Sequence, residues 1–442
     1  MNSNFNVIGA GLAGCEAANY LSRKQYHVNL YEMKPDHHTE AHKSDLFSEL
    51  VCSNSLKNSS ITTACGLLKC EMSLLGSLIL ESGLKNSLPA GSALAVDREG
   101  FSKYITDRLS NDKNITVINK KINSIQPFID DKETTTIICT GPLTAPELAN
   151  NLSDVTGKSN LFFFDAVSPS IELEDIDMSN AYMASRYGKG EAAYINCPFT
   201  KDEYGLFYNF VSNADTAILK DFENKKVFES CMPFEILAKR GIDTLRYGPM
   251  KPIGLTNPHR PELDYAVLQL RQDNKEATIY DLVGFQTNLT FPAQRELMKY
   301  IPALKNARIV RYGVMHKNIY LKAPDVLNRY FQMKEYCNIF FGGQISGVEG
   351  YMESAVSGLV AAINAVRKHE NNEMIDFTRE TMIGSLQHYI SNGTVSDFQP
   401  MNANYGIVEP LETHVKTKKL KYEIMAQRSI DKMKEIIRFN GI

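Results

Sequence analysis

Three glycines near the start of the chain have the spacing to hold a phosphate-bearing ligand. Gly9, Gly11 and Gly14 form the pattern G-x-G-x-x-G. The first glycine permits a tight turn, the second lets the backbone approach a pyrophosphate, and the third allows a helix to pack closely on a strand. The free N–H groups of that helix attract the phosphates. The residues expected to contact such a dinucleotide are Gly9, Ala10, Gly11, Ala13 and Gly14.

The segments around these glycines have the order of a βαβ unit. Residues 5–8 are apolar and predict a strand, and residues 13–21 have the apolar spacing of a helix. A second strand is expected over residues 27–31, with Glu32 at its end. The Glu32 carboxylate can accept hydrogen bonds from the ribose of a dinucleotide. Strand, helix and acid together argue against a glycine-rich turn that binds nothing.

Two later segments indicate that the dinucleotide is FAD. Residues 134–141 read TTTIICTG, a β-branched strand that ends at Gly141. Residues 338–344 read NIFFGGQ, a second buried strand that ends near Gly343 and Gln344 and precedes a helix of small residues. This arrangement resembles flavoproteins of the glutathione-reductase type, in which a late strand and helix close over the flavin. We therefore expect these residues to contact FAD.

Both ends of the chain thus contribute to one cofactor domain. The predicted fold class is α/β, with a Rossmann-like FAD-binding domain of the glutathione-reductase type built from both chain ends and an inserted α+β domain. Residues 1–185 and 320–442 are expected to form the two parts of the FAD-binding domain. Residues 186–319 then form the inserted substrate domain.

Composition and charge are those of a globular protein with a sizeable core. Hydrophobic residues make up 43% of the 442 residues, and the net charge is −3. No apolar run approaches the roughly 20 residues that cross a bilayer, and the N-terminus has no signal-peptide pattern. We therefore expect a cytoplasmic protein with no membrane contact. The sequence makes no prediction of the oligomeric state.

The cysteines and histidines do not have the spacing of metal ligands. The eight cysteines are scattered, and no pair has CxxC spacing. This argues against a disulfide framework and against a zinc site. His37, His38 and His42 lie close together but lack further ligands of suitable spacing, so we expect them to face solvent. No metal site is predicted.

Four of the cysteines have neighbours that suit thiol chemistry. Cys65 and Cys70 have the C-x4-C spacing of disulfide-reducing flavoenzymes, but no second G-x-G-x-x-G for NADPH follows. Cys52 lies among small polar residues that favour a loop. Cys231 precedes a proline and a predicted helix, where a thiolate is stabilised. From these features alone we interpret all four as packed or surface thiols, and a flavin-dependent NAD(P)H oxidase or thiol reductase stays open as an alternative.

Three segments in the middle of the chain combine aromatic and polar side chains. They are residues 246–252 (RYGPMKP), 284–288 (GFQTN) and 311–318 (RYGVMHKN). Such side chains suit stacking on bases or pterins and contacts to phosphate. On composition alone, ordinary turns with ordinary packing are the favoured interpretation.

Long segments distributed over nearly the whole chain carry a resemblance to one family. The segments are GAGLAGCEAA from Gly9, ELVCSNSL from Glu49, PAGSALAVDR from Pro89, ESCMPFE from Glu229, DTLRYGPMKPIGL from Asp243, QLRQDN from Gln269, RYGVMHKN from Arg311, GGQISGVEGYMES from Gly342 and FQPMNANYG from Phe398. Together they resemble the folate- and FAD-dependent RNA (uracil-5-)-methyltransferases.

The resemblance implies a reaction at carbon five of a uridine in structured RNA. The one-carbon unit comes from 5,10-methylenetetrahydrofolate and passes through the flavin N5, and NAD(P)H re-reduces the flavin. Uracil is a poor nucleophile at carbon five, and addition of a cysteine thiolate to carbon six activates it. The tRNA T-loop uridine is the favoured substrate, with a uridine of 23S ribosomal RNA as the alternative. Folate and RNA would bind the inserted domain.

The resemblance also implies roles for individual residues. Cys231 is the candidate nucleophile, and Cys52 is the candidate second thiol, as general base or as guard of the flavin adduct; their division of labour stays open. The family usually has no cysteine at Cys65 or Cys70. Glu349 and Tyr351 are candidate FAD contacts, and Tyr351 would lie near the isoalloxazine. The candidate contacts to folate or RNA are Arg246, Lys251, Arg311, His316 and Asn318.

Overall fold

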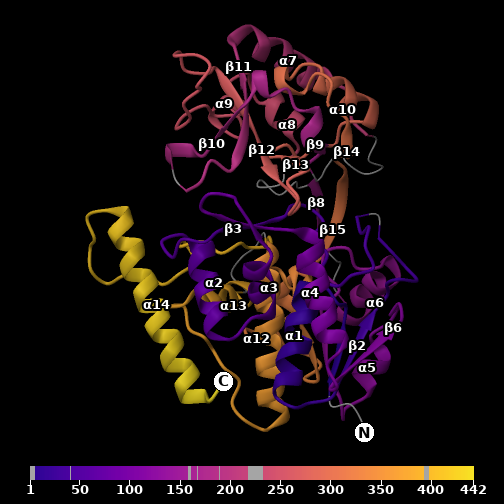
Figure 1. Ribbon diagram of the computed structural model, residues 1–442. Coiled ribbons are helices and arrows are strands. Elements are labelled where there is room, and N and C mark those ends of the chain that lie inside the picture. The colour runs from indigo at the N-terminus through magenta and orange to yellow at the C-terminus, as the bar shows by residue number, and fades with distance from the viewer. Residues whose placement is uncertain are drawn as a thin grey trace.

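The chain folds into two units that lie one above the other (Figure 1). The computed structural model describes residues 5–39, 41–157, 161–166, 168–188, 190–217, 232–392 and 398–442. The lower unit is built around a parallel sheet from both ends of the chain, and the upper unit around an antiparallel sheet from the middle of the chain. The predicted fold class, α/β with an inserted domain, is confirmed.

A five-stranded parallel sheet in the order β16-β7-β1-β2-β6 forms the centre of the lower unit. The strands are β1 (Phe5–Ile8), β2 (Val28–Glu32), β6 (Ile115–Asn119), β7 (Thr135–Ile138) and β16 (Ile339–Phe341). The late strand β16 pairs with β7, with Phe341 beside Ile138. Each of these strands lies in or overlaps a segment whose sequence predicts a strand, except β6. Strands β1, β7 and β16 are buried at every residue, as expected for the part of a parallel sheet that is covered on both faces.

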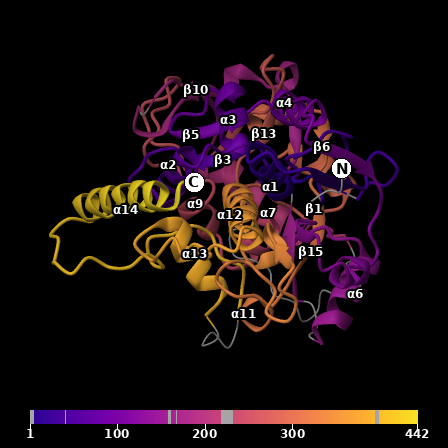
Figure 2. The same ribbon diagram turned by 90° about the horizontal axis from the view of Figure 1, so that it is seen from below.

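Two helices from opposite ends of the chain pack against each other beside this sheet. They are α1 (Leu12–Arg23) and α12 (Tyr351–His369), and Figure 2 shows them side by side. A Cβ atom added at Gly358 would lie 2.1 Å from the backbone oxygen of Ala13. No side chain fits in that space, so Gly358 is what lets α12 approach the start of α1.

Further elements complete the lower unit. A small antiparallel sheet has the order β3-β5-β4, with bounds Ser55–Asn58, Ala93–Val96 and Ser87–Leu88. The remaining helices are α2 (Ala64–Leu74), α3 (Leu78–Lys85), α4 (Arg98–Ser110), α5 (Gln126–Asp130), α6 (Pro146–Thr156), α11 (Ala323–Val326), α13 (Met382–Ile390) and α14 (Lys418–Asn440). None of the helices described combines the length and the apolar character of a membrane span.

A buried glutamate joins three of these helices. Glu71 of α2 accepts hydrogen bonds from the backbone N–H groups of Met382 and Ile383, at 2.8 Å each, and from the hydroxyl of Ser429 in α14. Its carboxylate thus caps the start of α13, where unpaired N–H groups favour negative charge. Burial raises the pKa of Glu71 to about 7.

The upper unit contains a six-stranded sheet in the order β10-β11-β12-β13-β9-β14. Its strands are β9 (Ser170–Glu172), β10 (Tyr182–Ala184), β11 (Tyr194–Phe199), β12 (Ala266–Gln272), β13 (Ile279–Leu282) and β14 (Ile309–Arg311). Its helices are α7 (Lys201–Asn213), α8 (Phe234–Lys239), α9 (Thr244–Tyr247) and α10 (Phe291–Met298). An aromatic core joins sheet and helices, with the rings of Phe234 and Phe285 stacked at 4.0 Å between centroids.

A two-stranded antiparallel ribbon connects the two units. It consists of β8 (Leu161–Ala166) and β15 (Met315–Tyr320). Strands β9 and β10 precede residue 186, the expected start of the insertion, yet belong to the upper sheet. We propose that the insertion lies between β8 and β15, because the chain passes from one sheet to the other along that ribbon.

Candidate active site

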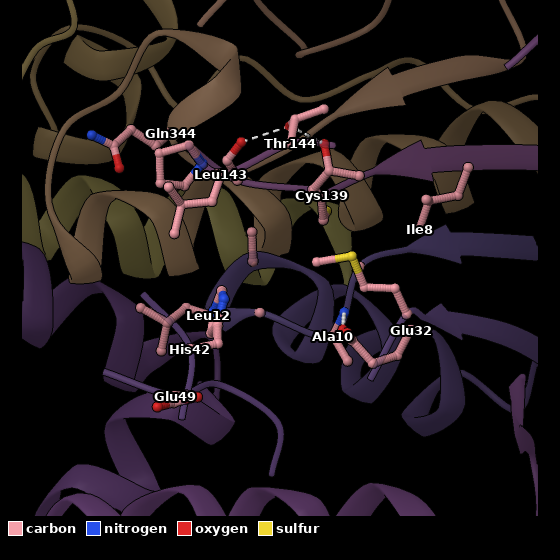
Figure 3. A pocket seen from close by; sticks show the side chains of 18 of the residues that line it. Ile8, Ala10, Leu12, Glu32, His42, Glu49, Cys139, Leu143, Thr144 and Gln344 are labelled. Carbon is pink, nitrogen blue, oxygen red and sulfur yellow. Dashed lines mark hydrogen bonds between the residues drawn. The ribbon is translucent and has the colours of Figure 1, made fainter. Parts of the chain in front are cut away.

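A cleft lies where β1 and β7 of the parallel sheet end. It is lined by the glycine turn after β1, by residues after β7 and β16, and by the start of α12 (Figure 3). The candidate cofactor residues in its lining are Gly9, Ala10, Gly11, Ala13, Glu32, Gly141, Gly343, Gln344 and Tyr351. Ligands of open α/β sheets bind at this edge of the sheet because the strands and helix N-termini converge there.

Each of the three positions in the turn requires glycine for a different structural reason. Gly9 has φ +101°, and a Cβ atom there would lie 2.6 Å from the carbonyl oxygen of Cys139 in the neighbouring strand end. A Cβ atom at Gly14 would lie 1.8 Å from the oxygen of Gly9. Gly11 is different, because a Cβ atom there would meet nothing within 4 Å. Gly11 therefore leaves open the space over which a pyrophosphate would approach.

Helix α1 begins at this turn without a capping side chain or an acidic residue of its own. Its N-cap residue, Gly11, provides no side-chain cap, and the first turn contains no acidic residue. The exposed N–H groups and the helix dipole therefore favour an anion. This fits the diphosphate of FAD.

The Glu32 carboxylate is held in place at the end of β2. It accepts hydrogen bonds from the backbone N–H groups of Ala10, at 2.8 Å, and Lys34, at 3.0 Å. Figure 3 shows Ala10 and Glu32 facing each other across the turn. Each carboxylate oxygen has further lone pairs, so Glu32 can also accept from a ribose hydroxyl. The carboxylate thus fixes the turn, and its contact with a ribose stays a prediction.

The far wall of the cleft comes from the segments after β7 and β16. Gly141 has φ +68°, and the carbonyl oxygen of Gly141 accepts a hydrogen bond from Thr144 at 2.8 Å. Gly343 has φ +86°, and its N–H group donates to the hydroxyl of Ser357 in α12 at 2.7 Å. Gln344 donates to the carboxylate of Glu349, which is 7% exposed. Glu349 thus orients a lining residue and is itself absent from the lining.

Cys52 lines the cleft beside Tyr351. The Tyr351 hydroxyl accepts hydrogen bonds from the N–H groups of Cys52, at 2.8 Å, and Ser53, at 3.1 Å. Burial raises the pKa of Tyr351 well above its usual value, so the phenol is neutral. The start of α12 therefore holds both the cleft wall and the loop that carries Cys52.

Comparisons with known proteins agree with this geometry. The family model described as "Glucose inhibited division protein A" matches residues 4–373. The chain belongs to this family. It is 52% identical over 435 residues to "Methylenetetrahydrofolate--tRNA-(uracil-5-)-methyltransferase TrmFO" of Staphylococcus aureus strain JH9, covering 98% of this chain and 99% of the relative. With the protein of the same name from strain MRSA252 the identity is 53% over 432 residues. The expected family resemblance is confirmed.

Solved structures of this family share the fold. The chain is similar to Aquifex aeolicus GidA in two crystal forms, with TM-scores of 0.70 and 0.69 and 15% sequence identity. The match covers 99% and 98% of this chain, and 76% and 73% of the GidA chains. At this identity the likeness shows the fold alone.

The candidate substrate residues of this family member lie in different places. Asn318 of β15 is 3% exposed and lines the cleft. Arg246 lies in the upper unit, with its guanidinium 3.7 Å from the ring centroid of Tyr265, and Lys251 is exposed nearby in sequence. Neither lines the cleft. Contacts of these residues with folate or RNA stay a prediction.

Two further candidates have partners or positions that constrain their roles. Arg311 pairs with Asp273 at 3.0 Å, so its guanidinium is already engaged by a carboxylate. His316 lies in β15 opposite Asp165, and the structure describes its backbone only. Cys231, the candidate nucleophile, lies outside the described residues.

The remaining thiols and histidines do not have the geometry of a redox pair or a metal site in the part of the chain that the structure describes. Cys65 and Cys70 both lie in α2, where a rise of about 1.5 Å per residue sets their Cα atoms roughly 7.5 Å apart along the axis. A disulfide needs Cα atoms closer than about 7 Å, so the helix keeps these thiols apart. His42 lines the cleft and does not simply face solvent, which corrects the expectation for that residue. Among the described residues no His, Cys, Asp and Glu group could hold a metal ion.

Sequence reasoning missed a set of charged residues behind Cys52. They are Arg98, Arg271, Asp273 and Asp281. Arg98 ends the PAGSALAVDR segment, and Arg271 and Asp273 lie in QLRQDN, so the motifs that carry the resemblance contained most of the signal. These residues meet through contacts between the two units, which no spacing along the chain reveals.

Proposed function

We propose that this protein is a methylenetetrahydrofolate- and FAD-dependent methyltransferase that acts on carbon five of a uridine in RNA. The observation that carries the proposal is a cleft formed by the glycine turn and Glu32 whose lining also includes Cys52. The names of the Staphylococcus aureus relatives describe this activity on tRNA. We therefore propose tRNA as the substrate, with the T-loop uridine as the target.

The residues of the cleft would hold FAD from both ends of the chain. The N-terminus of α1 would receive the diphosphate, Glu32 the ribose, and the segment from Gly343 to Tyr351 the flavin end. When bound, FAD supplies the redox chemistry and carries the one-carbon unit from methylenetetrahydrofolate. The protein orients the reactants and keeps water from the reacting atoms.

The two thiols would act on uracil. The thiolate of Cys231 adds to carbon six, the C5=C6 double bond opens, and carbon five gains the electron density needed to attack the one-carbon unit. A base then removes the proton from carbon five as the bond between the one-carbon unit and its carrier breaks. Two electrons from NAD(P)H, supplied through FAD when it is bound, would reduce the resulting methylene to a methyl group as the thiolate leaves carbon six and the C5=C6 double bond reforms. Cys52 is our candidate for that base, because it lies at the cleft. In the alternative assignment, Cys52 is the nucleophile and Cys231 is the base.

Covalent trapping separates the two thiols. RNA that contains 5-fluorouridine cannot lose a proton from carbon five, so the enzyme–RNA adduct accumulates. We expect Cys231→Ala to abolish the adduct and Cys52→Ala to retain it, with both variants yellow and FAD-bound. The readout is a denaturing gel together with the flavin spectrum. An adduct in Cys231→Ala would assign the nucleophile to another residue.

The substrate and the reductant are tested in one assay. The FAD-loaded enzyme is given methylenetetrahydrofolate and NADH or NADPH, with unmodified tRNA or a 23S ribosomal RNA fragment, and 5-methyluridine is measured. We expect methylation of tRNA, dependent on the nicotinamide nucleotide. Methylation of the ribosomal fragment but not of tRNA would show that ribosomal RNA, and not tRNA, is the substrate. NAD(P)H turnover without methyl transfer would contradict the proposal and indicate an oxidase. A thiol reductase that uses Cys65 and Cys70 is disfavoured, because α2 keeps the two thiols apart. We also propose a cytoplasmic location, where all these reactants occur.

A further inference from the structure

Three arginines surround two buried aspartates in a cluster at the junction of the two units. Arg98 of α4 donates to Asp273 at 2.7 Å and to Asp281 at 3.1 Å. Arg311 donates to the other oxygen of Asp273 at 3.0 Å, and Arg271 lies 3.8 Å from Asp281. Both aspartates are 3% exposed. These five residues are called the arginine–aspartate cluster below, and Figure 1 shows α4 in the lower unit and β12 and β13 in the upper unit.

The cluster is bonded to the loop that carries Cys52, residues 50–54. Arg271 donates from one edge of its guanidinium to the Ser53 hydroxyl, at 2.7 Å, and to the Asn54 side-chain oxygen, at 2.8 Å. Arg98 donates to the carbonyl oxygen of the first residue of the loop. The loop therefore receives hydrogen bonds from an arginine of each unit, one on either side of Cys52.

Other bonds confirm that the loop spans the junction. Asn54 is fully buried and donates to the backbone oxygens of Val96, at 3.1 Å, and Gln272, at 2.8 Å. The first of these lies in the lower unit and the second in the upper. The Tyr351 hydroxyl of α12 also accepts hydrogen bonds from two N–H groups of the loop. The loop is therefore held by α12, β5 and β12 at once. A shift of the upper unit would thus move the Cys52 backbone.

The charges of the cluster do not cancel. Three guanidinium groups face two carboxylates, and burial raises the pKa of Asp281, so the cluster holds at least one positive charge in excess beside the loop. Burial opposes ionisation, but Arg98 and Arg311 hold the pKa of Asp273 below its usual value. Buried ion pairs add little net stability, because desolvation offsets the attraction. Their effect here is on geometry and on the local potential, and a positive charge near a thiol favours its thiolate.

We propose that Arg98 and Arg271 are positioning residues for Cys52. The arginine–aspartate cluster sets the Cys52 thiol at the flavin cleft, provides positive charge behind it, and ties its position to the upper unit. This rests on the proposed function only in giving Cys52 a part in the reaction.

The test compares three variants of the FAD-loaded enzyme. Arg271→Gln removes the charge and one half of the fork, and Arg271→Lys keeps the charge but cannot make both hydrogen bonds in the same geometry. The matched control is Arg308→Gln, because Arg308 also pairs with two carboxylates of the upper unit but is 74% exposed at the sheet edge. One measurement is the kcat of methyl transfer, and the other is the rate of Cys52 alkylation by iodoacetamide at pH 7, read by peptide mass spectrometry.

We expect Arg271→Gln to lower kcat at least tenfold and to slow Cys52 alkylation at least threefold, with KM for tRNA within twofold. Arg271→Lys should restore alkylation to within twofold but only part of kcat, and Arg308→Gln should change neither. Unchanged kcat, or alkylation that is unchanged or faster in Arg271→Gln, overturns the proposal.

A milder variant covers the case in which Arg271→Gln does not fold. Ser53→Ala removes a single acceptor from the same fork, and we expect a lower kcat with FAD retained. Wild-type kcat with Ser53→Ala would then overturn the proposal. The alkylation rate needs no RNA, so it tests the positioning of Cys52 even if the wild-type enzyme transfers no methyl group and the proposed function fails.

Discussion

At the scale of single residues, the cleft depends on groups that serve the protein and the cofactor at once. The Glu32 carboxylate accepts hydrogen bonds from two backbone N–H groups, those of Ala10 and Lys34. Glu32 is 7% exposed, so removing its carboxylate would leave two buried N–H donors without an acceptor. Each unpaired donor costs about 1 to 3 kcal/mol of stability. Mutation of Glu32 is therefore expected to affect both the conformation of the glycine turn and the binding of the cofactor.

Glu32→Ala should weaken FAD binding at least tenfold. The ribose loses an acceptor, and the N–H groups of Ala10 and Lys34 lose theirs, which loosens the glycine turn. Glu32→Gln keeps one oxygen and should bind FAD with intermediate affinity. The fraction of flavin retained after dialysis, measured by absorbance, should decrease from wild type to Glu32→Gln to Glu32→Ala. Equal retention in wild type and Glu32→Ala would contradict a role for Glu32 in the site.

At the scale of elements, the cleft depends on how closely α12 lies on α1. The contact is between the middle of α12 and the first turn of α1, so the same packing that builds the core also sets the glycine turn. Cores are packed as densely as organic crystals, and one added methyl group at such a point forces the backbone to move.

Gly358→Ala should destabilise the fold by about 1 to 3 kcal/mol and reduce FAD retention. The added Cβ atom would lie 2.1 Å from the Ala13 oxygen, so α12 must shift away from the turn. Gly205→Ala in α7 is the matched control, because a Cβ atom there meets nothing within 4 Å. It should stabilise the protein by about 0.5 to 1 kcal/mol, since alanine is the better helix former. Urea unfolding measures both, and equal effects would refute the packing argument.

At the scale of the whole molecule, buried carboxylates join segments that are far apart in the chain. Glu71 links α2 with α13 and α14, and Glu16 of α1 accepts from the N–H groups of Leu78 and Ile79 at the start of α3. Burial raises the pKa of each to about 7, above the ordinary value of 4.5. The folded protein therefore binds protons that the unfolded chain has already released.

Stability should fall as pH rises from about 4.5 to 7. In that window the folded state holds more protons, so the free energy of unfolding decreases with pH and then levels off. Each of Glu16 and Glu71 should contribute about 1 to 3 kcal/mol to this fall. Glu71→Gln cannot titrate, so the fall in its unfolding free energy between pH 5 and 8 should be smaller than in wild type. An identical fall would show that Glu71 titrates normally.

The residues that line the candidate cofactor site were largely predictable from the sequence because the rules that place them are local. Gly9, Gly11 and Gly14 are spaced by the geometry of one turn and one helix, and Glu32 ends the strand that must lie beside that turn. The resemblance of residues 134–141 and 338–344 to flavoproteins of the glutathione-reductase type also indicated that both chain ends build one domain. The start of the inserted domain was less predictable, because β9 and β10 are short and their partners lie elsewhere in the sequence.

Only the tertiary structure decided how Cys52 is held. Arg98, Arg271 and Asp281 come from separate segments, and they meet because the ribbon of β8 and β15 sets the upper sheet against the loop of residues 50–54. Sequence motifs marked Arg98 and Arg271 but assigned them no function. Local spacing determines a turn and the phosphate that fits it, whereas an ion cluster between two units depends on distances that exist only once both units have folded and docked.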